Sequence, residues 1–203
     1  MIHWRSGTVR EVTSSRAGAV RLRVDVDGTD TPALALTDLV GTPQVGDTVL
    51  LNVSALRRRL GTGGHALVVA DATRLPDDPA DAPGHIVKAR YTPLQQMVLA
   101  LEEQESPHHD AMREHPDIAA GDLRRMPVVV AELHSALPAV LAGVRAVAPQ
   151  ARVGYVMTDS ASLPFALSDS AARLVEAGWL DTTITAGQAF GGEHEAITVH
   201  SAL

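Results

Sequence analysis

Three polar loops of the chain carry side chains that could do chemistry. Each loop follows an apolar run, namely Val128–Ala131, Val153–Met157 or Thr182–Ala186, and precedes a helical pattern. The candidate binding and catalytic residues are His134 and Ser135 in the first loop, Thr158, Asp159 and Ser160 in the second, and Gln188, Gly191, Gly192 and Glu193 in the third. Because parallel strands present their carboxyl ends at one edge of a sheet, where such folds bind ligands, we expect these residues to line one pocket.

His134 and Asp159 are the candidate catalytic pair. They follow successive predicted strands at equivalent positions, so the imidazole could act as a general base that the carboxylate orients. Ser135 and Ser160 are candidate nucleophiles for this pair, although neither lies in a Gly-x-Ser-x-Gly elbow. The alternative is that His134 hydrogen-bonds its own loop while Asp159 and the serines cap the turns that follow, which is a common use of these residues. The sequence leaves both roles open.

The third loop, Gly187–Glu193, is rich in glycine and precedes a predicted helix. Adjacent glycines allow backbone amides to face an anion at the start of a helix, and Gln188 offers both a donor and an acceptor. The loop matches neither the P-loop pattern nor the dinucleotide-binding Gly-x-Gly-x-x-Gly pattern, so it names no cofactor. A plain tight turn is the alternative to ligand contact.

The residue types limit the chemistry further. The chain has no cysteine, which excludes disulfides, thiolate nucleophiles and cysteine-ligated metals. Its nine histidines include the adjacent pair His108-His109. Neighbouring residues on a helix diverge by about 100°, and the pattern His-Glu-x-x-His is absent, so we expect no metal site.

The overall composition restricts the partners. The chain has 203 residues, of which 45% are hydrophobic, and a formal net charge of −7. This charge argues against nucleic acid as a partner, because binding nucleic acid requires a basic face. The one basic run, Arg57-Arg58-Arg59, is interpreted as a solvated turn rather than a phosphate clamp. The sequence shows neither a signal peptide nor a window of roughly 18 apolar residues, so we expect a cytoplasmic protein without a membrane partner.

Residues 1–75 have the pattern of a small β-barrel-like domain. Five short segments are rich in strand-forming residues: Gly7–Thr13, Val20–Val26, Thr31–Leu36, Thr48–Val53 and Ala66–Ala70. Asp27-Gly28 predicts a two-residue hairpin turn, and Gly61–Gly64 predicts another turn between strands. The close spacing of these strands favours a small closed or half-closed barrel.

A linker at residues 76–90, which includes the acidic and proline-rich run Pro76–Pro83, leads to a predicted α/β domain at residues 91–203. The predicted helices are Thr92–Leu101, a shorter one after Ser106-Pro107, residues 136–148 capped by Ser135, residues 163–177 capped by Ser162, and Glu193–Leu203. With the three apolar runs as strands, the order indicates a partial doubly wound parallel sheet, so the fold class is α/β. One sheet edge would be poorly covered, which predicts that the domain is truncated at its C-terminus.

A set of fragments, read in order, carries a family resemblance. They are Gly61–Gly64, Gly84–Lys88, Tyr91–Gln95, Glu102–Gln104 with Ser106–His109, Met126–Val130, Leu133–Ser135, Tyr155–Asp159 and Gly187–Gly192. Together they resemble a bacterial family of unknown function, known as domain of unknown function 3866, over nearly the whole chain. The resemblance implies no known activity, and it implies a longer protein that continues with glycine-rich α/β sequence. Arg57-Arg58-Arg59 and His194 are not features of that family, so neither is expected to carry function.

The sequence therefore predicts a protein that binds a small polar or anionic metabolite where the three loops meet. A metal-independent hydrolase or transferase that uses His134 with Asp159 is the first alternative, and it requires the two side chains to approach within about 3.2 Å or one water molecule. A scaffold that binds a partner through the barrel is the second alternative, and it predicts an exposed apolar patch on residues 1–75. The ligand, any cofactor and the oligomeric state are not determined by the sequence.

Overall fold

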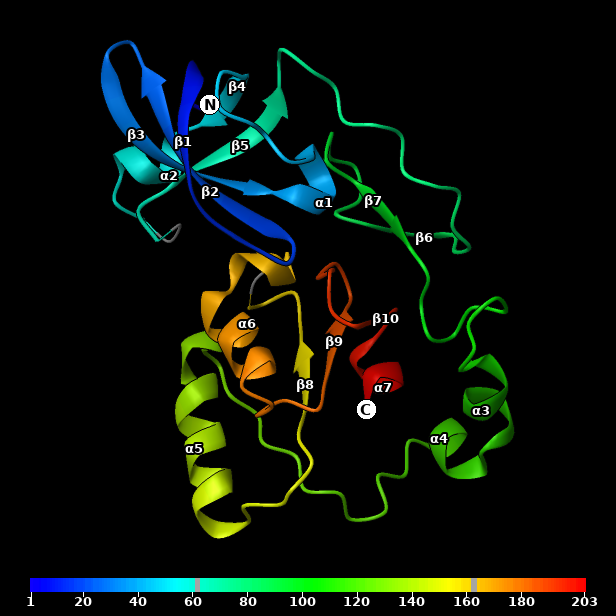
Figure 1. Ribbon diagram of the computed structural model, residues 1–203. Helices are drawn as coiled ribbons and strands as arrows, with labels where there is room; N and C mark the ends of the chain where they lie inside the picture. The colour runs from blue at the N-terminus through cyan, green and yellow to red at the C-terminus, as the bar shows by residue number, and fades with distance from the viewer. Residues whose placement is uncertain (61–62, 162–163) are drawn as a thin grey trace. The chain divides into compact units, whose positions relative to one another are not determined.

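The computed structural model describes residues 1–60, 63–161 and 164–203 (Figure 1). The chain divides into two compact units, Met1–Ala80 and Asp81–Leu203. The division falls within the run Pro76–Pro83, which contains no helix or strand. Within the described ranges, no helix is both long enough and apolar enough to cross a membrane.

The first unit is a closed five-stranded β-barrel with the strand order β1-β2-β3-β5-β4. The strands are β1 (Trp4–Arg16), β2 (Ala19–Val26), β3 (Thr29–Leu36), β4 (Thr48–Asn52) and β5 (Ala66–Asp71). All neighbouring strands are antiparallel except β3 and β5, which are parallel. Closure of the barrel leaves no strand edge unpaired in the described residues. The predicted barrel and its five strands are confirmed.

Local sequence explains the barrel well. Alternate residues of β2, including Val20, Leu22 and Val24, are buried in the barrel core, because successive side chains of a strand point to opposite faces. Asp27 and Gly28 have φ values of 50° and 77°, the left-handed conformation that a two-residue type I′ turn requires. The predicted hairpin turn is therefore confirmed. Two short helices, α1 (Thr37–Val40) and α2 (Ser54–Arg57), connect the remaining strands.

The second unit contains a parallel sheet of three short strands in the order β10-β9-β8. They are β8 (Gly154–Met157), β9 (Thr182–Ala186) and β10 (His194–Ala196). Gly154 pairs with Thr182 and Met157 with Thr185, so the predicted parallel pairing of these two runs is confirmed. The helix α5 (Leu137–Val147) precedes β8, and α6 (Asp169–Glu176) lies in the crossover from β8 to β9 (Figure 1).

The predicted strand at Val128–Ala131 is wrong. This segment has no regular structure, and its valines are exposed, with Val130 at 91%. Its β-branched residues favour a strand, but a strand also needs a hydrogen-bonding partner, and the segment pairs with no described strand. The third strand of the parallel sheet is β10 instead, and the sheet does not reach the size of a doubly wound domain.

The end of the chain also differs from the prediction. In place of one helix over Glu193–Leu203, the chain forms β10 and then the short helix α7 (Val199–Ala202). Thr198 and Ser201 form a reciprocal capping box that starts α7. The β-branched residues before it therefore lie outside the helix, in agreement with their weak helix propensity.

The segment Thr92–Leu101, predicted as a helix, forms part of an antiparallel pair of strands. β6 (Ile86–Lys88) pairs with β7 (Gln96–Val98). The Thr92 hydroxyl donates to the backbone oxygen of Ala89 at 2.9 Å, so it stabilises the turn between the strands rather than a helix start. In so short a segment, the apolar positions are compatible with the period of a helix and with that of a strand. Pairing with β6 selects the strand.

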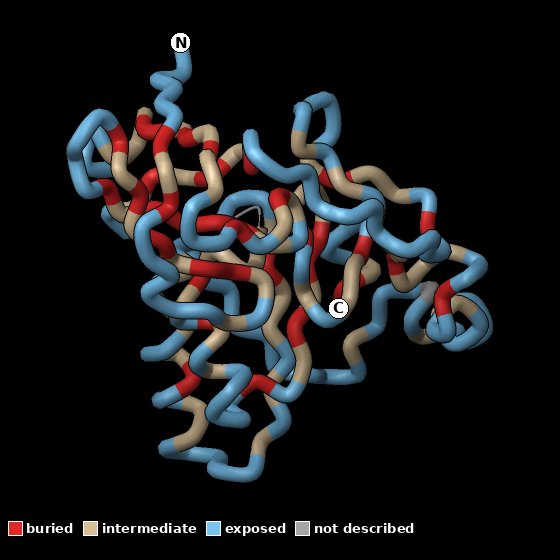
Figure 2. Tube along the Cα trace, turned by 45° about the horizontal axis from the view of Figure 1, so that its top comes forward, coloured by how far each residue is buried: buried red, intermediate tan, exposed pale blue. Residues whose placement is uncertain are grey.

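The remaining helices of the second unit are short. They are α3 (His109–Glu114), α4 (Pro116–Ala120) and the 3-10 turns η1 (His134–Ala136) and η2 (Phe165–Leu167). The predicted helix after Ser106-Pro107 is thus present as α3, whereas α6 starts at Asp169, capped by the Ser168 side chain, and not near residue 163. Ser162, Gly61 and Thr62, which entered the predictions, lie outside the described residues. Figure 2 shows that buried positions occur in both units.

Candidate functional site

The loop Gly187–Glu193 leaves the carboxyl end of β9 and returns to β10, which runs parallel to β9. Parallel strands are usually joined by a crossover of a dozen or more residues, so this short connection has to fold back over the end of β9. Gly192 permits the close approach. A Cβ at this position would lie 3.0 Å from the amide nitrogen of Thr185 and 3.1 Å from the backbone oxygen of Thr183.

Asp159 holds the first part of the loop. Its Oδ1 atom accepts hydrogen bonds from the backbone amides of Gln188 and Ala189. Asp159 follows β8, so this contact joins the loop after β8 to the loop after β9. Both loops lie at the carboxyl ends of these parallel strands, as expected from the sequence. Thr158 and Ser160 belong to the same turn, in which the backbone oxygen of Thr158 accepts from Ala161.

A buried ion pair holds the middle of the loop. Lys88 is 0% exposed, and its ammonium group donates to the backbone oxygens of Thr185 and Ala189, both at 2.8 Å, and to Oε2 of Glu195 at 2.7 Å. All three protons of the ammonium group are therefore used. The Thr185 hydroxyl also donates to Glu195, at 2.7 Å. Burying such a pair costs desolvation energy and adds little stability, so its effect here is to fix the loop geometry.

Sequence reasoning missed Lys88 and Glu195. Lys88 is the only lysine of the chain, and it ends the otherwise apolar strand Ile86–Lys88. A lysine in an apolar strand indicates a buried ammonium group, which requires a partner of opposite charge. Nothing in the sequence pointed to Glu195 as that partner, because the two residues are 107 positions apart.

The amides of the glycine pair have protein acceptors. Gly191 donates to Oε1 of Glu195 at 2.6 Å, and Gly192 donates to the Thr185 hydroxyl at 3.1 Å. The amide of Glu193 donates to the Thr183 hydroxyl at 3.1 Å. These amides therefore hold the loop in place and are not available to bind an anion. An anion at this edge of the sheet would have to be bound by side chains.

The turn between β6 and β7 is hydrogen-bonded to the same loop. The amide of Arg90 donates to the side-chain oxygen of Gln188 at 3.1 Å. The flanking residues Ala89 and Tyr91 have φ values of 49° and 63°, which non-glycine residues rarely adopt, and Tyr91 is 96% exposed. Arg90 is exposed, and within the described residues its guanidinium group has no hydrogen-bond or ion-pair partner.

His134 lies elsewhere in the unit. It begins η1, and its ring nitrogens contact the Tyr155 hydroxyl at 2.7 Å and the Ser168 hydroxyl. Burial lowers the pKa of His134 and raises the pKa of Tyr155, so both groups are neutral near pH 7. Among the described residues, no hydrogen bond joins His134 to Asp159, whose Oδ1 atom accepts from the loop amides, and a catalytic role for this pair stays a prediction.

Ser168, one of the two hydroxyl partners of His134, is largely buried. Ser168 is 8% exposed, and its hydroxyl already accepts from the amide of Ala171 as the cap of α6. A serine in this position is poorly accessible to a substrate. Ser135, proposed as a nucleophile or cap, makes no side-chain cap contact, and the helix α5 starts after the 3-10 turn that contains it.

A cavity of about 510 Å³ opens in the first unit, and none of the predicted site residues lines it. Its lining residues are Met1, Ile2, His3, Asn52, Ser54, Ala55, Arg58 and Leu60. Arg57, which contacts the ring of His3 at 3.0 Å, is the main reason that the pKa of His3 is lowered. Met1, Ile2 and Leu60 are exposed apolar groups of the kind that the scaffold hypothesis requires, and partner binding through the barrel stays a prediction.

The fold and the loop contacts define a two-unit protein, in which a closed β-barrel precedes a mixed α/β region that holds a rigid glycine-rich loop at the edge of a parallel sheet. The chain belongs to the family described as a protein of unknown function, DUF3866, whose model matches residues 32–203. No curated protein and no solved structure matches the chain. The match begins inside β3 and extends over the whole second unit.

Proposed function

We propose that this protein binds a small anionic metabolite, carrying a carboxylate or a phosphate, at the edge of the parallel sheet where the loops after β8 and β9 meet. The observation that carries the proposal is the hydrogen bond from the Arg90 amide to Gln188, because it fixes an exposed arginine beside the rigid loop. A guanidinium group without a protein partner is suited to bind carboxylate or phosphate oxygens in a bidentate manner.

The rigidity of the loop supports binding. Its backbone is fixed by Asp159 at one end and by the Lys88–Glu195 pair in the middle. Ordering a loop when the ligand binds costs affinity, and a loop that is ordered beforehand avoids that cost. The side-chain amide nitrogen of Gln188, whose oxygen is already held, is then the expected second donor to the ligand.

The conformation of the turn at Ala89 and Tyr91 gives further support. Left-handed conformations of non-glycine residues cost about 1–3 kcal/mol each when they are sparsely populated, and they occur preferentially at ligand-binding positions. Here two of them flank Arg90. The same segment presents the exposed phenol of Tyr91, which can add a hydrogen bond to the ligand.

The test is a thermal-shift screen of the full chain with carboxylates, sugar phosphates and nucleotides, each paired with a neutral analogue. A ligand at 100 times its Kd stabilises the folded state by about 2.7 kcal/mol. We expect an anionic ligand to raise Tm, and Arg90→Gln to abolish the shift. Arg113→Gln, at another exposed arginine of the same unit, is the matched control and should keep it.

Two results would overturn the proposal. One is a screen in which no anion raises Tm more than its neutral analogue. The other is a ligand that Arg90→Gln and Arg113→Gln bind equally well.

A further inference from the structure

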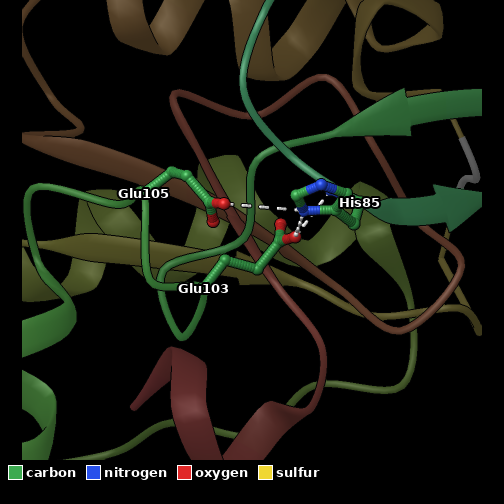
Figure 3. Close-up of side chains that lie close together, drawn as sticks. All are labelled: His85, Glu103 and Glu105. Atoms are coloured by element: carbon green, nitrogen blue, oxygen red, sulfur yellow. Dashed lines mark hydrogen bonds and ion pairs between the residues drawn. The ribbon is translucent and has the colours of Figure 1, made fainter.

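A second cluster in the same unit consists of His85, Glu103 and Glu105 (Figure 3). His85 directly precedes β6, and the two glutamates lie in the turns between β7 and α3. The Nδ1 atom of His85 lies 3.4 Å from Oε1 of Glu103 and 3.9 Å from Oε1 of Glu105. One ligand atom from each residue lies within 4.8 Å of the other two.

Glu103 is held in place by the backbone. Its side chain is 10% exposed, and its two oxygens accept from the amides of His85 at 2.6 Å and Ala100 at 2.7 Å. A carboxylate has about four lone-pair positions, so two remain for a cation. Hydrogen bonds that orient a carboxylate from outside are typical of metal ligands.

The spacing fits a metal ion. Ligand atoms at 2.0–2.2 Å from a tetrahedral ion are roughly 3.3–3.6 Å from one another. The separation between His85 and Glu103 already has this value, and Glu105, whose side chain is 42% exposed and therefore free to adjust, lies 3.9 Å from His85 and within 4.8 Å of Glu103. In the described part of the chain, no lysine or arginine forms an ion pair with either glutamate, so the mostly buried carboxylate of Glu103 lacks a permanent cation.

The surrounding charge favours a cation as well. Residues 81–203 contain fifteen acidic and eight basic residues, whereas residues 1–80 contain nine of each. The net charge of the whole chain, −7, therefore belongs to the unit that carries the cluster. Such a field raises the local concentration of divalent cations.

We propose that His85, Glu103 and Glu105 bind one divalent transition-metal ion, of which Zn²⁺ fits the imidazole and carboxylate ligands best. Three protein ligands leave one position of a tetrahedral ion for water or another small ligand. The sequence predicted no metal site, because the ligands follow no known spacing and the β6–β7 pair brings His85 to the glutamates only in the folded chain.

The test uses the full chain after removal of metal with a chelator. Titration with ZnCl₂, followed by calorimetry, should give one site per chain. Titration with Co²⁺ should produce the visible absorption bands of a low-symmetry ion with nitrogen and oxygen ligands. His85→Ala and Glu105→Gln should each weaken Zn²⁺ binding at least about tenfold.

Matched controls make the result specific. His115→Ala and Glu132→Gln remove an exposed histidine and an exposed glutamate elsewhere in the same unit, and should bind Zn²⁺ as the parent does. The proposal is overturned if the parent binds no stoichiometric Zn²⁺, or if His85→Ala binds it as tightly as His115→Ala. Circular dichroism of Glu105→Gln, whose side chain makes no backbone contact in the described residues, should match the parent and so separate loss of metal from loss of fold.

Discussion

Lys88 and His134 show how single polar side chains hold the second unit together. The ammonium group of Lys88 has three acceptors in the buried interior, and both ring nitrogens of His134 have a partner. Buried polar groups are tolerated when their hydrogen bonds are made, and each lost bond costs about 1 kcal/mol or more. At the residue scale, these side chains are therefore structural supports of the loop and of the start of α6.

The pKa of His134 leads to a prediction about pH. Burial lowers the folded-state pKa below the ordinary value of about 6.5, so between the two values the unfolded chain binds more protons. The stability that neutral His134 contributes is therefore complete above pH 6.5 and is lost as the pH falls through the folded-state pKa. His134→Gln cannot titrate, and we expect it to lower Tm at pH 8 but to lose less stability than the parent on acidification.

Thermal unfolding of both proteins between pH 8 and pH 5 measures this effect. A difference in Tm between parent and variant that is the same at every pH would contradict the prediction.

At the element scale, the connection between β9 and β10 is the most constrained part of the second unit. Its amides bond to side chains of β9 and β10, and Gly192 lies against the β9 backbone. A parallel pair this tightly connected requires a residue without a side chain at the point of closest approach.

Gly192→Ala tests that requirement. The added Cβ would lie 3.0 Å from the Thr185 amide nitrogen and 3.1 Å from two backbone oxygens, which are rigid neighbours. We expect the free energy of unfolding to fall by about 1–3 kcal/mol. Gly143→Ala in α5, where a Cβ meets nothing within 4 Å, is the matched control and should be neutral or stabilising because alanine favours helix. Chemical denaturation measures the free energy of unfolding of both variants. Equal stability of the two would argue against a close approach of Gly192 to the β9 backbone.

At the scale of the whole molecule, the described residues of the barrel core all belong to the first unit. The thirteen buried residues of that core all lie between Val9 and Val68. The run Pro76–Pro83 contributes no strand or helix to either unit. A core that is complete within one segment of the chain is the physical requirement for independent folding.

We therefore expect the barrel to stay folded when the chain is cut at the boundary of the units. A specific protease site inserted between Ala80 and Asp81 allows the cut to be made in the folded protein. After cleavage, the isolated fragment 1–80 should keep a β-type circular dichroism spectrum and a cooperative thermal transition, as the uncut protein does. Loss of both on separation would show that the barrel depends on the second unit.

The barrel could be predicted from the sequence because its information is local. Alternation along Val20–Val26 and the turn at Asp27 and Gly28 specify two strands and their register without reference to distant residues. The pairing of β8 with β9 was predictable for a similar reason, since each apolar run is short and a helical pattern lies between them.

The tertiary structure decided which segments pair when they are distant in the sequence or when their residues suit more than one secondary structure. The segment Gln96–Val98 became a strand because β6 was available as a partner, whereas Val128–Ala131 found none and stayed irregular. The contacts of Lys88 with Glu195 and of His134 with Ser168 join residues 107 and 34 positions apart. The sequence by itself determined which residues prefer a strand, a turn or a cap. Which polar groups meet depended on packing, because a buried charge or imidazole takes whichever partner the folded chain brings within hydrogen-bonding distance.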